Sequence, residues 1–156
     1  MKIQNLLAHD MILLGLESKE REGVLREIVG FLKNRNRISK EKDLYEKLVQ
    51  REKLGSTAIG GGVAIPHCKM KGIKDPVVML AISQGGVNFH SLDGKLSHLI
   101  FLVASTPDNP SLNLQILAAI AHLVRKANSL LTKVLDAKNI PEILDIIREE
   151  EEKINE

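Results

Sequence analysis

The chain of 156 residues fits a single domain, because domains usually run to about 100–200 residues. Hydrophobic residues make up 44% and charged residues 27% of the sequence, which is the balance of an ordinary globular protein and not of a disordered chain. Aromatic residues are only 3%, and the formal net charge is +2. The sequence therefore lacks both the stacking platforms and the strongly basic charge of a typical nucleic-acid binder, and we expect no nucleic-acid partner.

The single cysteine, Cys68, excludes an internal disulfide and a zinc site built from several cysteines. No stretch approaches the roughly 20 apolar residues that are needed to span a bilayer. The N-terminal segment has too short an apolar run for a secretory signal, and it lacks a small-residue cleavage site. We therefore expect a cytoplasmic protein with no direct membrane insertion.

Apolar periodicity and turn residues predict an alternation of strands and helices. In chain order, the predicted elements are a strand at 11–16, helices at 19–33 (capped by Ser18) and from Ser39 to about 53, strands at 57–59, 63–65, 77–83 and 99–104, and helices at 110–125, 129–137 and 141–150. The glycine triplet at 60–62 predicts a tight turn, and Gly85–Gly86 and Asp93–Gly94 predict the turns between the two long strands.

This order of elements predicts one α/β domain over residues 1–156, with a mixed sheet flanked by helices on both faces as an α/β/α sandwich. Residues 140–156 contain seven acids and two bases, a net charge of −5, so the remainder carries +7. We interpret residues 149–156 as a frayed acidic tail.

Among five histidines, His67 has the most distinctive position, because it follows a glycine-rich turn, a short strand and Pro66. This arrangement presents a side chain rigidly at a strand end. A neutral imidazole with one free ring nitrogen can attack phosphorus, provided that its other nitrogen donates to a fixed acceptor. Glycine amides and the hydroxyls of Ser56 and Thr57 can donate hydrogen bonds to a phosphate group. The residues alone leave an ordinary structural histidine as an open alternative.

Other patterns point to weaker possibilities. The phosphate-loop patterns GxxxxGK[ST] and GxGxxG are absent. His67 and Cys68 have no third ligand at a recognisable spacing, so we expect no metal and no cofactor. Residues 33–42 carry five bases and one acid, which indicates either a surface that steers an acidic partner or a solvated loop between helices.

The segment 51–69, REKLGSTAIGGGVAIPHCK, resembles the type-2 enzyme IIA domains of the bacterial phosphoenolpyruvate-dependent phosphotransferase system, the mannitol/fructose and nitrogen-regulatory class. It is most similar to the nitrogen-regulatory branch. The resemblance extends over nearly the whole chain, including NFHSLDGK around Asp93 and the helix with NLQIL. It implies the enzyme IIA type-2 fold and a phosphotransferase activity with a phosphohistidine intermediate.

By this resemblance, His67 is the residue that accepts a phosphoryl group on Nε2 from an HPr-type carrier and passes it to a IIB domain or keeps it as a regulatory signal. Arg51, sixteen residues earlier, corresponds to the active-site arginine of the family. Its planar guanidinium suits the oxygens of a transferring phosphoryl group. Thr57 matches the threonine of the motif and is expected to support the site, with Ser56 as a weaker candidate.

The main departure from the family is Asn113, forty-six residues after His67, where a second histidine is often found. Asparagine donates an N–H to a phosphate oxygen but neither carries positive charge nor moves a proton. This departure favours an alternative interpretation, in which the protein is a nitrogen-regulatory-type binding module that controls regulatory target proteins, with little or no sugar transport.

Overall fold

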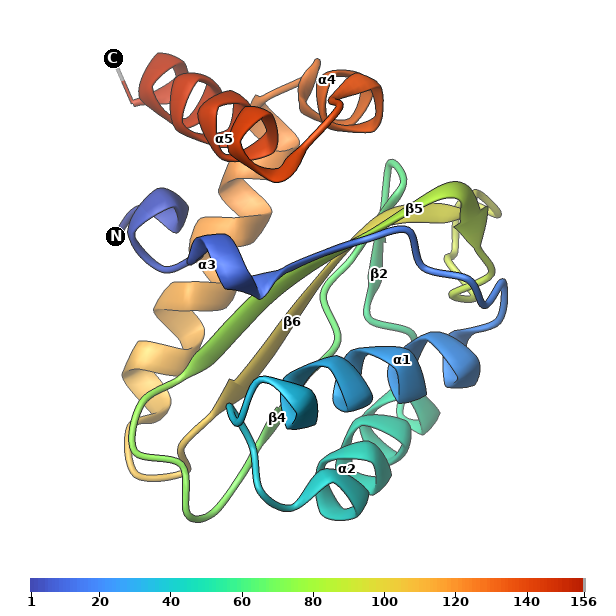
Figure 1. Ribbon diagram of the computed structural model, residues 1–156, viewed down its shortest axis with the longest axis vertical. Helices are drawn as coiled ribbons and strands as arrows, with labels where there is room; N and C mark the ends of the chain where they lie inside the picture. The colour runs from blue at the N-terminus through green and yellow to red at the C-terminus, as the bar shows by residue number, and fades with distance from the viewer. Residues whose placement is uncertain (156) are drawn as a thin grey trace.

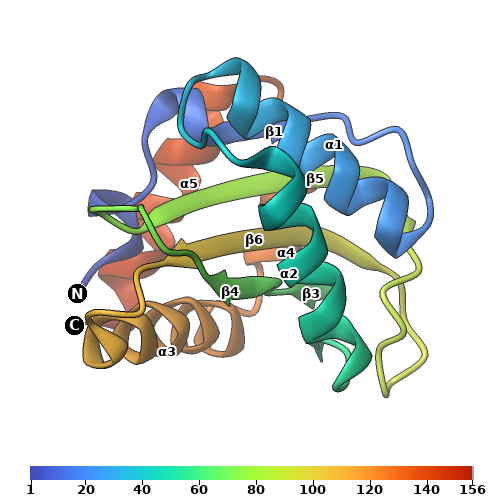
Figure 2. The same cartoon turned by 90° about the horizontal axis from the view of Figure 1, so that it is seen from below.

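The computed structural model describes residues 1–155 and contains a six-stranded mixed sheet between two groups of helices (Figures 1 and 2). Helices α1 (Arg21–Asn34) and α2 (Glu41–Lys53) lie on one side of the sheet. Helices α3 (Pro110–Lys126), α4 (Leu130–Asp136) and α5 (Ile140–Ile154) lie on the other. The predicted α/β/α sandwich is therefore confirmed. All helix ends except the end of α5 fall within two residues of their predicted positions.

The sheet is ordered β1-β5-β6-β3-β2, and β4 pairs with β6 beside β3. The strands are β1 (Ile12–Leu14), β2 (Ala58–Gly60), β3 (Val63–Ala64), β4 (His67–Lys69), β5 (Val77–Val87) and β6 (Ser97–Ser105), preceded by the short 3-10 turns η1 (Ile3–Asn5) and η2 (His9–Met11). β5 and β6 are antiparallel, whereas β3 and β4 run parallel to β6. None of the helices in residues 1–155 is long and apolar enough to cross a membrane.

The two long central strands form the middle of the hydrophobic core. Helices cover both faces of β5 and β6, so nearly every side chain along VVMLAIS and LIFLVA is buried. This accounts for the continuous apolar runs, which differ from the alternation of apolar and polar residues that is typical of a sheet with one solvent-exposed face. Met79, Leu80 and Phe101 are among the largest fully buried side chains.

The strand that carries His67 lies at an edge of the sheet. The sequence predicts that the short strand at 63–65 ends at Pro66, but the chain pairs again with β6 immediately afterwards, His67 opposite Val103 and Cys68 opposite Ala104. Pro66 lacks an N–H, yet its carbonyl accepts a hydrogen bond from Val103 N at 3.0 Å, so the ladder continues past it. Of the strands described, only β6 pairs with β4. The other edge of β4 faces the space between α2 and α3.

The predicted turn at 85–86 is wrong, because both glycines lie inside β5, which continues to Val87. Gly86 has a φ of +86°, and the register with β6 shifts between Ile82 and Val87. The glycines therefore mark an irregularity within a strand rather than its end. The chain reverses at the second predicted turn, around Gly94.

The predicted frayed tail is also wrong, because α5 continues through Ile154; Glu156 lies outside the described residues. Glu151 is 3% exposed, and its carboxylate accepts hydrogen bonds from Ile3 N at 2.6 Å and Gln4 N at 3.0 Å. Glu150 is buried as well and lies 2.5 Å from Lys133 Nζ. This hydrogen bond from Lys133 lowers the pKa of the Glu150 carboxyl below its usual value. The acidic run is thus partly internal, because the N-terminal turn and α4 supply donors to it.

Replacing Glu151 with Ala is expected to lower the free energy of unfolding by roughly 1–3 kcal/mol, because the buried N–H of Ile3 and the partly buried N–H of Gln4 lose their acceptor. Urea denaturation followed by circular dichroism measures this loss. Glu149→Ala removes an exposed glutamate from the same turn of α5 and serves as the control. Equal stability of the two variants would contradict a structural role for the Glu151 carboxylate.

Candidate functional site

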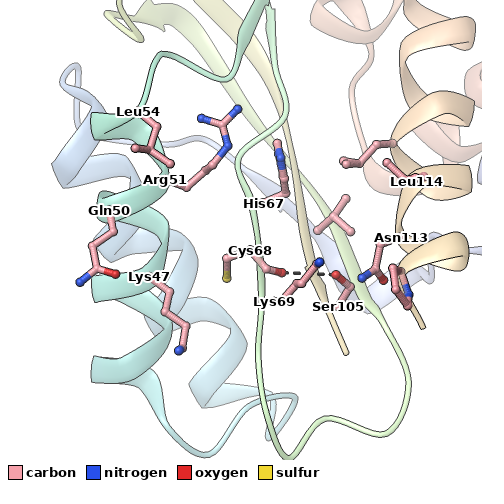
Figure 3. Close-up of a pocket in the computed structure, with 13 residues that line it drawn as sticks. Lys47, Gln50, Arg51, Leu54, His67, Cys68, Lys69, Ser105, Asn113 and Leu114 are labelled. Carbon is pink, nitrogen blue, oxygen red and sulfur yellow. Dashed lines mark hydrogen bonds between the residues drawn. The ribbon is translucent and has the colours of Figure 1, made fainter. Parts of the chain in front are cut away.

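A pocket of about 700 Å³ lies above β4, between α2 and α3 (Figure 3). Four segments that are distant in the sequence meet around it. The lining residues are Lys47, Gln50, Arg51 and Leu54 from α2 and its end, His67, Cys68 and Lys69 from β4, Val103 and Ser105 from β6, and Pro110, Asn113, Leu114 and Leu117 from α3. Three of the predicted site residues, Arg51, His67 and Asn113, are thus brought together.

His67 is half-buried on β4, and its ring orientation is fixed by its own backbone neighbourhood. Nδ1 lies 2.7 Å from the carbonyl oxygen of Ile65. A carbonyl oxygen only accepts hydrogen bonds, so the proton of a neutral ring is on Nδ1 and the lone pair is on Nε2. Pro66 restricts Ile65 to an extended conformation, which holds this acceptor in place. The geometry therefore presents Nε2 as the nucleophilic nitrogen.

Arg51 reaches the pocket from the last turn of α2 (Figure 3). Its Nη1 donates a hydrogen bond of 2.8 Å to the carbonyl oxygen of Gly55, just after the helix. A guanidinium has five N–H donors in one plane, and this is the only hydrogen bond that it makes within residues 1–155. The anchored side chain thus has donors left for an anion beside His67.

Asn113 lies in the second turn of α3, on the opposite side of the pocket from Arg51 (Figure 3). Its side chain is buried, with the residue 6% exposed, and Nδ2 donates a hydrogen bond of 3.1 Å to the carbonyl oxygen of Thr106. Oδ1 is buried without a hydrogen-bond partner among the described residues. One N–H of the amide is therefore committed to the backbone, and its predicted contact with phosphate would have to use the other N–H.

Thr57 and Ser56 do not line the pocket. Thr57 is 5% exposed, and its hydroxyl donates to Glu52 Oε2 at 2.5 Å. The Ser56 hydroxyl donates to the carbonyl oxygen of Phe89 at 2.5 Å and accepts a hydrogen bond from Ala58 N. The prediction that these two hydroxyls donate directly to phosphate is therefore corrected, because both are committed to contacts within the protein.

The glycine triplet at 60–62 also serves a different purpose from the one expected. All three glycines have positive φ values, between +64° and +86°, which explains the residue type. The N–H of Gly61 donates to Asp93 Oδ2 at 3.0 Å. Hydrogen bonds from Ser91, then from the backbone of Gly61 and Lys95, lower the pKa of Asp93 to about 2. The turn is thus tied to the loop before β6 and does not line the pocket around His67.

The charged side chains of residues 1–155 that line the pocket are all cationic: Lys47 and Lys69 accompany Arg51, and no carboxylate is among them. Sequence reasoning missed both lysines, although Lys47, Arg51 and Leu54 follow the spacing of one helix face. Burial raises the pKa of the Cys68 thiol to about 12, so it is protonated at neutral pH and is a poor nucleophile and metal ligand. Among residues 1–155, no cluster of three or more His, Cys, Asp or Glu side chains is arranged to hold a metal ion. The pocket is suited to an anion that approaches Nε2 of His67.

The fold and this pocket define an α/β domain in which a histidine with a hydrogen-bonded Nδ1 lines a cationic pocket. The family model described as "Phosphoenolpyruvate-dependent sugar phosphotransferase system, EIIA 2" matches residues 5–150. The chain therefore belongs to this family, and the resemblance stated from the sequence is confirmed.

Relatives from both branches of the family match. The fructose-specific EIIABC component of Bacillus subtilis is 34% identical over 149 residues, which are 96% of this chain and only 23% of that protein. The crystal structure of IIA-Ntr from Neisseria meningitidis superposes with a TM-score of 0.84 and 28% identity, covering 93% of this chain and 98% of the other. The Escherichia coli enzyme IIA for mannitol, solved in complex with its phosphorylated enzyme IIB, has the same fold, with a TM-score of 0.73 and 18% identity over 92% of this chain and 99% of that one.

Proposed function

We propose that the protein is a phosphoryl carrier that accepts a phosphoryl group on Nε2 of His67 from the phosphohistidine of an HPr-type carrier. The observation that carries the proposal is the hydrogen bond of 2.7 Å between Nδ1 and the carbonyl of Ile65, which leaves the Nε2 lone pair free in a cationic pocket. In the reaction, a bond forms between Nε2 and phosphorus while the bond from phosphorus to the carrier's imidazole nitrogen breaks. The electron pair of that bond returns to the carrier's ring.

The pocket supplies charge where the transferring group carries its negative oxygens. Arg51 contributes the N–H donors that Gly55 leaves free, and Lys47 and Lys69 add positive charge at the rim. The donor is an activated phosphoramidate, so the reaction needs positioning and charge stabilisation rather than a metal ion. Family membership independently supports a phosphotransfer role.

The labelling experiment tests this proposal directly. The purified protein is incubated with phosphoenolpyruvate, enzyme I, an HPr-type carrier and a radiolabelled phosphoryl source. We expect one phosphoryl group per chain, lost in acid and stable in base, as is typical of a phosphoramidate. No labelling under conditions in which the carrier itself is fully phosphorylated would refute the proposal.

Two destinations of the phosphoryl group are compatible with the relatives. The Bacillus relative is named as a fructose-specific EIIABC component, and the mannitol protein was solved with an enzyme IIB, which favours onward transfer to a IIB domain. The Neisseria relative is a nitrogen regulatory protein, which favours a signal read by regulatory targets. Asn113 favours the regulatory alternative, because its amide cannot shuttle a proton during transfer. Direct measurement of transfer to a IIB domain separates the two: rapid transfer favours the transport carrier, and none favours the regulator.

Replacing Asn113 with His is expected to add a second ionisation near pH 6–7 to the rate of phosphoryl transfer, because an imidazole then lies in the pocket beside His67. Rates measured between pH 5 and 9 with the HPr-type carrier show this as a change in the shape of the profile. Asn128→His, an exposed position after α3, is the control. Superimposable profiles for Asn113→His and the parent protein would show that residue 113 does not take part in the chemistry.

A further inference from the structure

We propose that Glu52 and Thr57 are positioning residues for His67, which hold the carbonyl of Ile65 where it selects the reactive tautomer of the imidazole. This inference rests on the proposed phosphoryl-carrier function and assigns a role within it to a buried carboxylate outside the pocket. The role differs from the one predicted for Thr57 from the sequence, because the hydroxyl acts through the backbone and not on the phosphate.

Glu52 is a buried acid in the last turn of α2, and its side chain is only 1% exposed. Both carboxylate oxygens accept hydrogen bonds from Thr57, Oε1 from the backbone N–H at 2.9 Å and Oε2 from the hydroxyl at 2.5 Å. Neighbouring Arg51 extends into the pocket from the same turn. The end of α2 thus contributes the Arg51 side chain to the pocket and the Glu52 side chain to the segment that leads to His67.

Thr57 connects this carboxylate to His67 through the backbone. The carbonyl oxygen of Thr57 accepts a hydrogen bond from Ile65 N at 3.0 Å, and the carbonyl oxygen of Ile65 lies 2.7 Å from Nδ1 of His67. Pro66 has already restricted Ile65 to an extended conformation. With its N–H fixed on Thr57 as well, Ile65 has little freedom to turn its carbonyl away from the imidazole. Glu52 therefore influences the position of the Ile65 carbonyl through two successive hydrogen bonds, and a third joins that carbonyl to His67.

Charge pairing does not account for this burial. The nearest cation to Glu52 is Arg21, whose Nη1 is 4.0 Å from Oε1, and Arg21 lies closer to Glu22, at 3.0 Å. A buried carboxylate is costly unless hydrogen bonds satisfy it, and the hydrogen bonds that the Glu52 carboxylate accepts within residues 1–155 both come from Thr57. The segment stabilised by this carboxylate is the one that leads to Ile65 and His67.

The test measures the tautomer and the reactivity of His67 in two variants. Thr57→Val keeps the shape of the side chain but removes its hydroxyl donor, whereas Thr57→Ser keeps the hydroxyl. Nitrogen-15 chemical shifts of the His67 ring in the unphosphorylated protein report the fraction with the proton on Nδ1. For Thr57→Val we expect a mixture of tautomers and a rate of phosphoryl uptake that is roughly three- to tenfold lower, the effect of one lost hydrogen bond. Thr57→Ser should keep the parent tautomer and a rate of phosphoryl uptake within about twofold of the parent rate.

Further variants keep the test decisive. If Thr57→Val does not fold, Glu52→Gln takes its place. This variant keeps the size of the side chain but removes its charge and one hydrogen-bond acceptor. It is expected to give a mixture of His67 tautomers as well. Glu22→Gln, which removes the other carboxylate beside Arg21, is expected to change neither readout. Thr132→Val, at an exposed threonine of α4, controls for the substitution itself.

The proposal is overturned if Thr57→Val, or Glu52→Gln in its place, keeps the Nδ1–H tautomer and the parent rate. It is also overturned if Thr57→Ser is as impaired as Thr57→Val, because bulk and not the hydroxyl would then matter. The ring shifts are recorded without any phosphoryl donor. A parent protein that is not labelled by the carrier would therefore refute the proposed function, while the shifts would still decide whether Glu52 and Thr57 control the imidazole.

Discussion

Replacing His67 with Gln is expected to abolish phosphoryl uptake from an HPr-type carrier. Glutamine keeps a polar side chain of similar size on β4, but its amide nitrogen has no lone pair that is available to attack phosphorus. The pocket, with Arg51, Lys47 and Lys69, would remain intact. The measurement is the amount of acid-labile phosphoryl group per chain after incubation with phosphoenolpyruvate, enzyme I and the carrier.

His122→Gln is the matched control for this prediction, because His122 is exposed on α3 and does not line the pocket. It should be labelled as fully as the parent protein. Persistent labelling of His67→Gln, with loss in another histidine variant, would show that the phosphoryl group resides elsewhere. Loss of labelling in both variants would point to a fold or docking defect and would be checked by circular dichroism.

Replacing Arg51 with Gln is expected to lower the rate of phosphoryl uptake by about 10²–10³, the usual cost of removing a donor that stabilises developing charge in an enclosed site. Gly55 anchors the guanidinium at 2.8 Å, so it is oriented before the donor arrives. Lysine at this position keeps the charge but loses the planar set of donors, and Arg51→Lys should therefore fall between the parent and Gln. Rapid-quench kinetics with the phosphorylated carrier measure these rates.

Lys53→Gln provides the comparison, since Lys53 is an exposed cation in the same turn of α2 and does not line the pocket. It removes the same formal charge, so a comparable loss in Lys53→Gln would mean that Arg51 acts only through the general positive field. A loss confined to Arg51→Gln would support direct contact with the transferring group.

The long elements of the fold were predictable because their signals are strong and local. β5 and β6 are apolar runs bounded by turn residues, and α3 begins at Asn109 and Pro110, whose capping pattern appears unchanged in the structure. β4 was not predicted, because its three residues carry no apolar pattern and follow a proline. Its existence depends on pairing with β6, about thirty-six residues away, which no local window contains.

The site was predictable to a similar degree. The spacing and the family motif placed Arg51, His67 and Asn113, and the structure brings all three to one pocket. A direct contact of Ser56 and Thr57 with phosphate was wrongly predicted, because the sequence of a glycine-rich segment does not indicate which group a hydroxyl will contact. Glu52, which fixes the direction of the Thr57 hydroxyl, is indistinguishable in the sequence from the solvated acids around it.

The hydrogen bonds from Ile3 and Gln4 to Glu151 make the two ends of the chain depend on each other. A deletion or a fused tag that unwinds the last turns of α5 will therefore release the opening turn as well, and both are expected to exchange their amide hydrogens together. Handles for purification or immobilisation are better inserted at the exposed loop around Gly94, where neither end is disturbed.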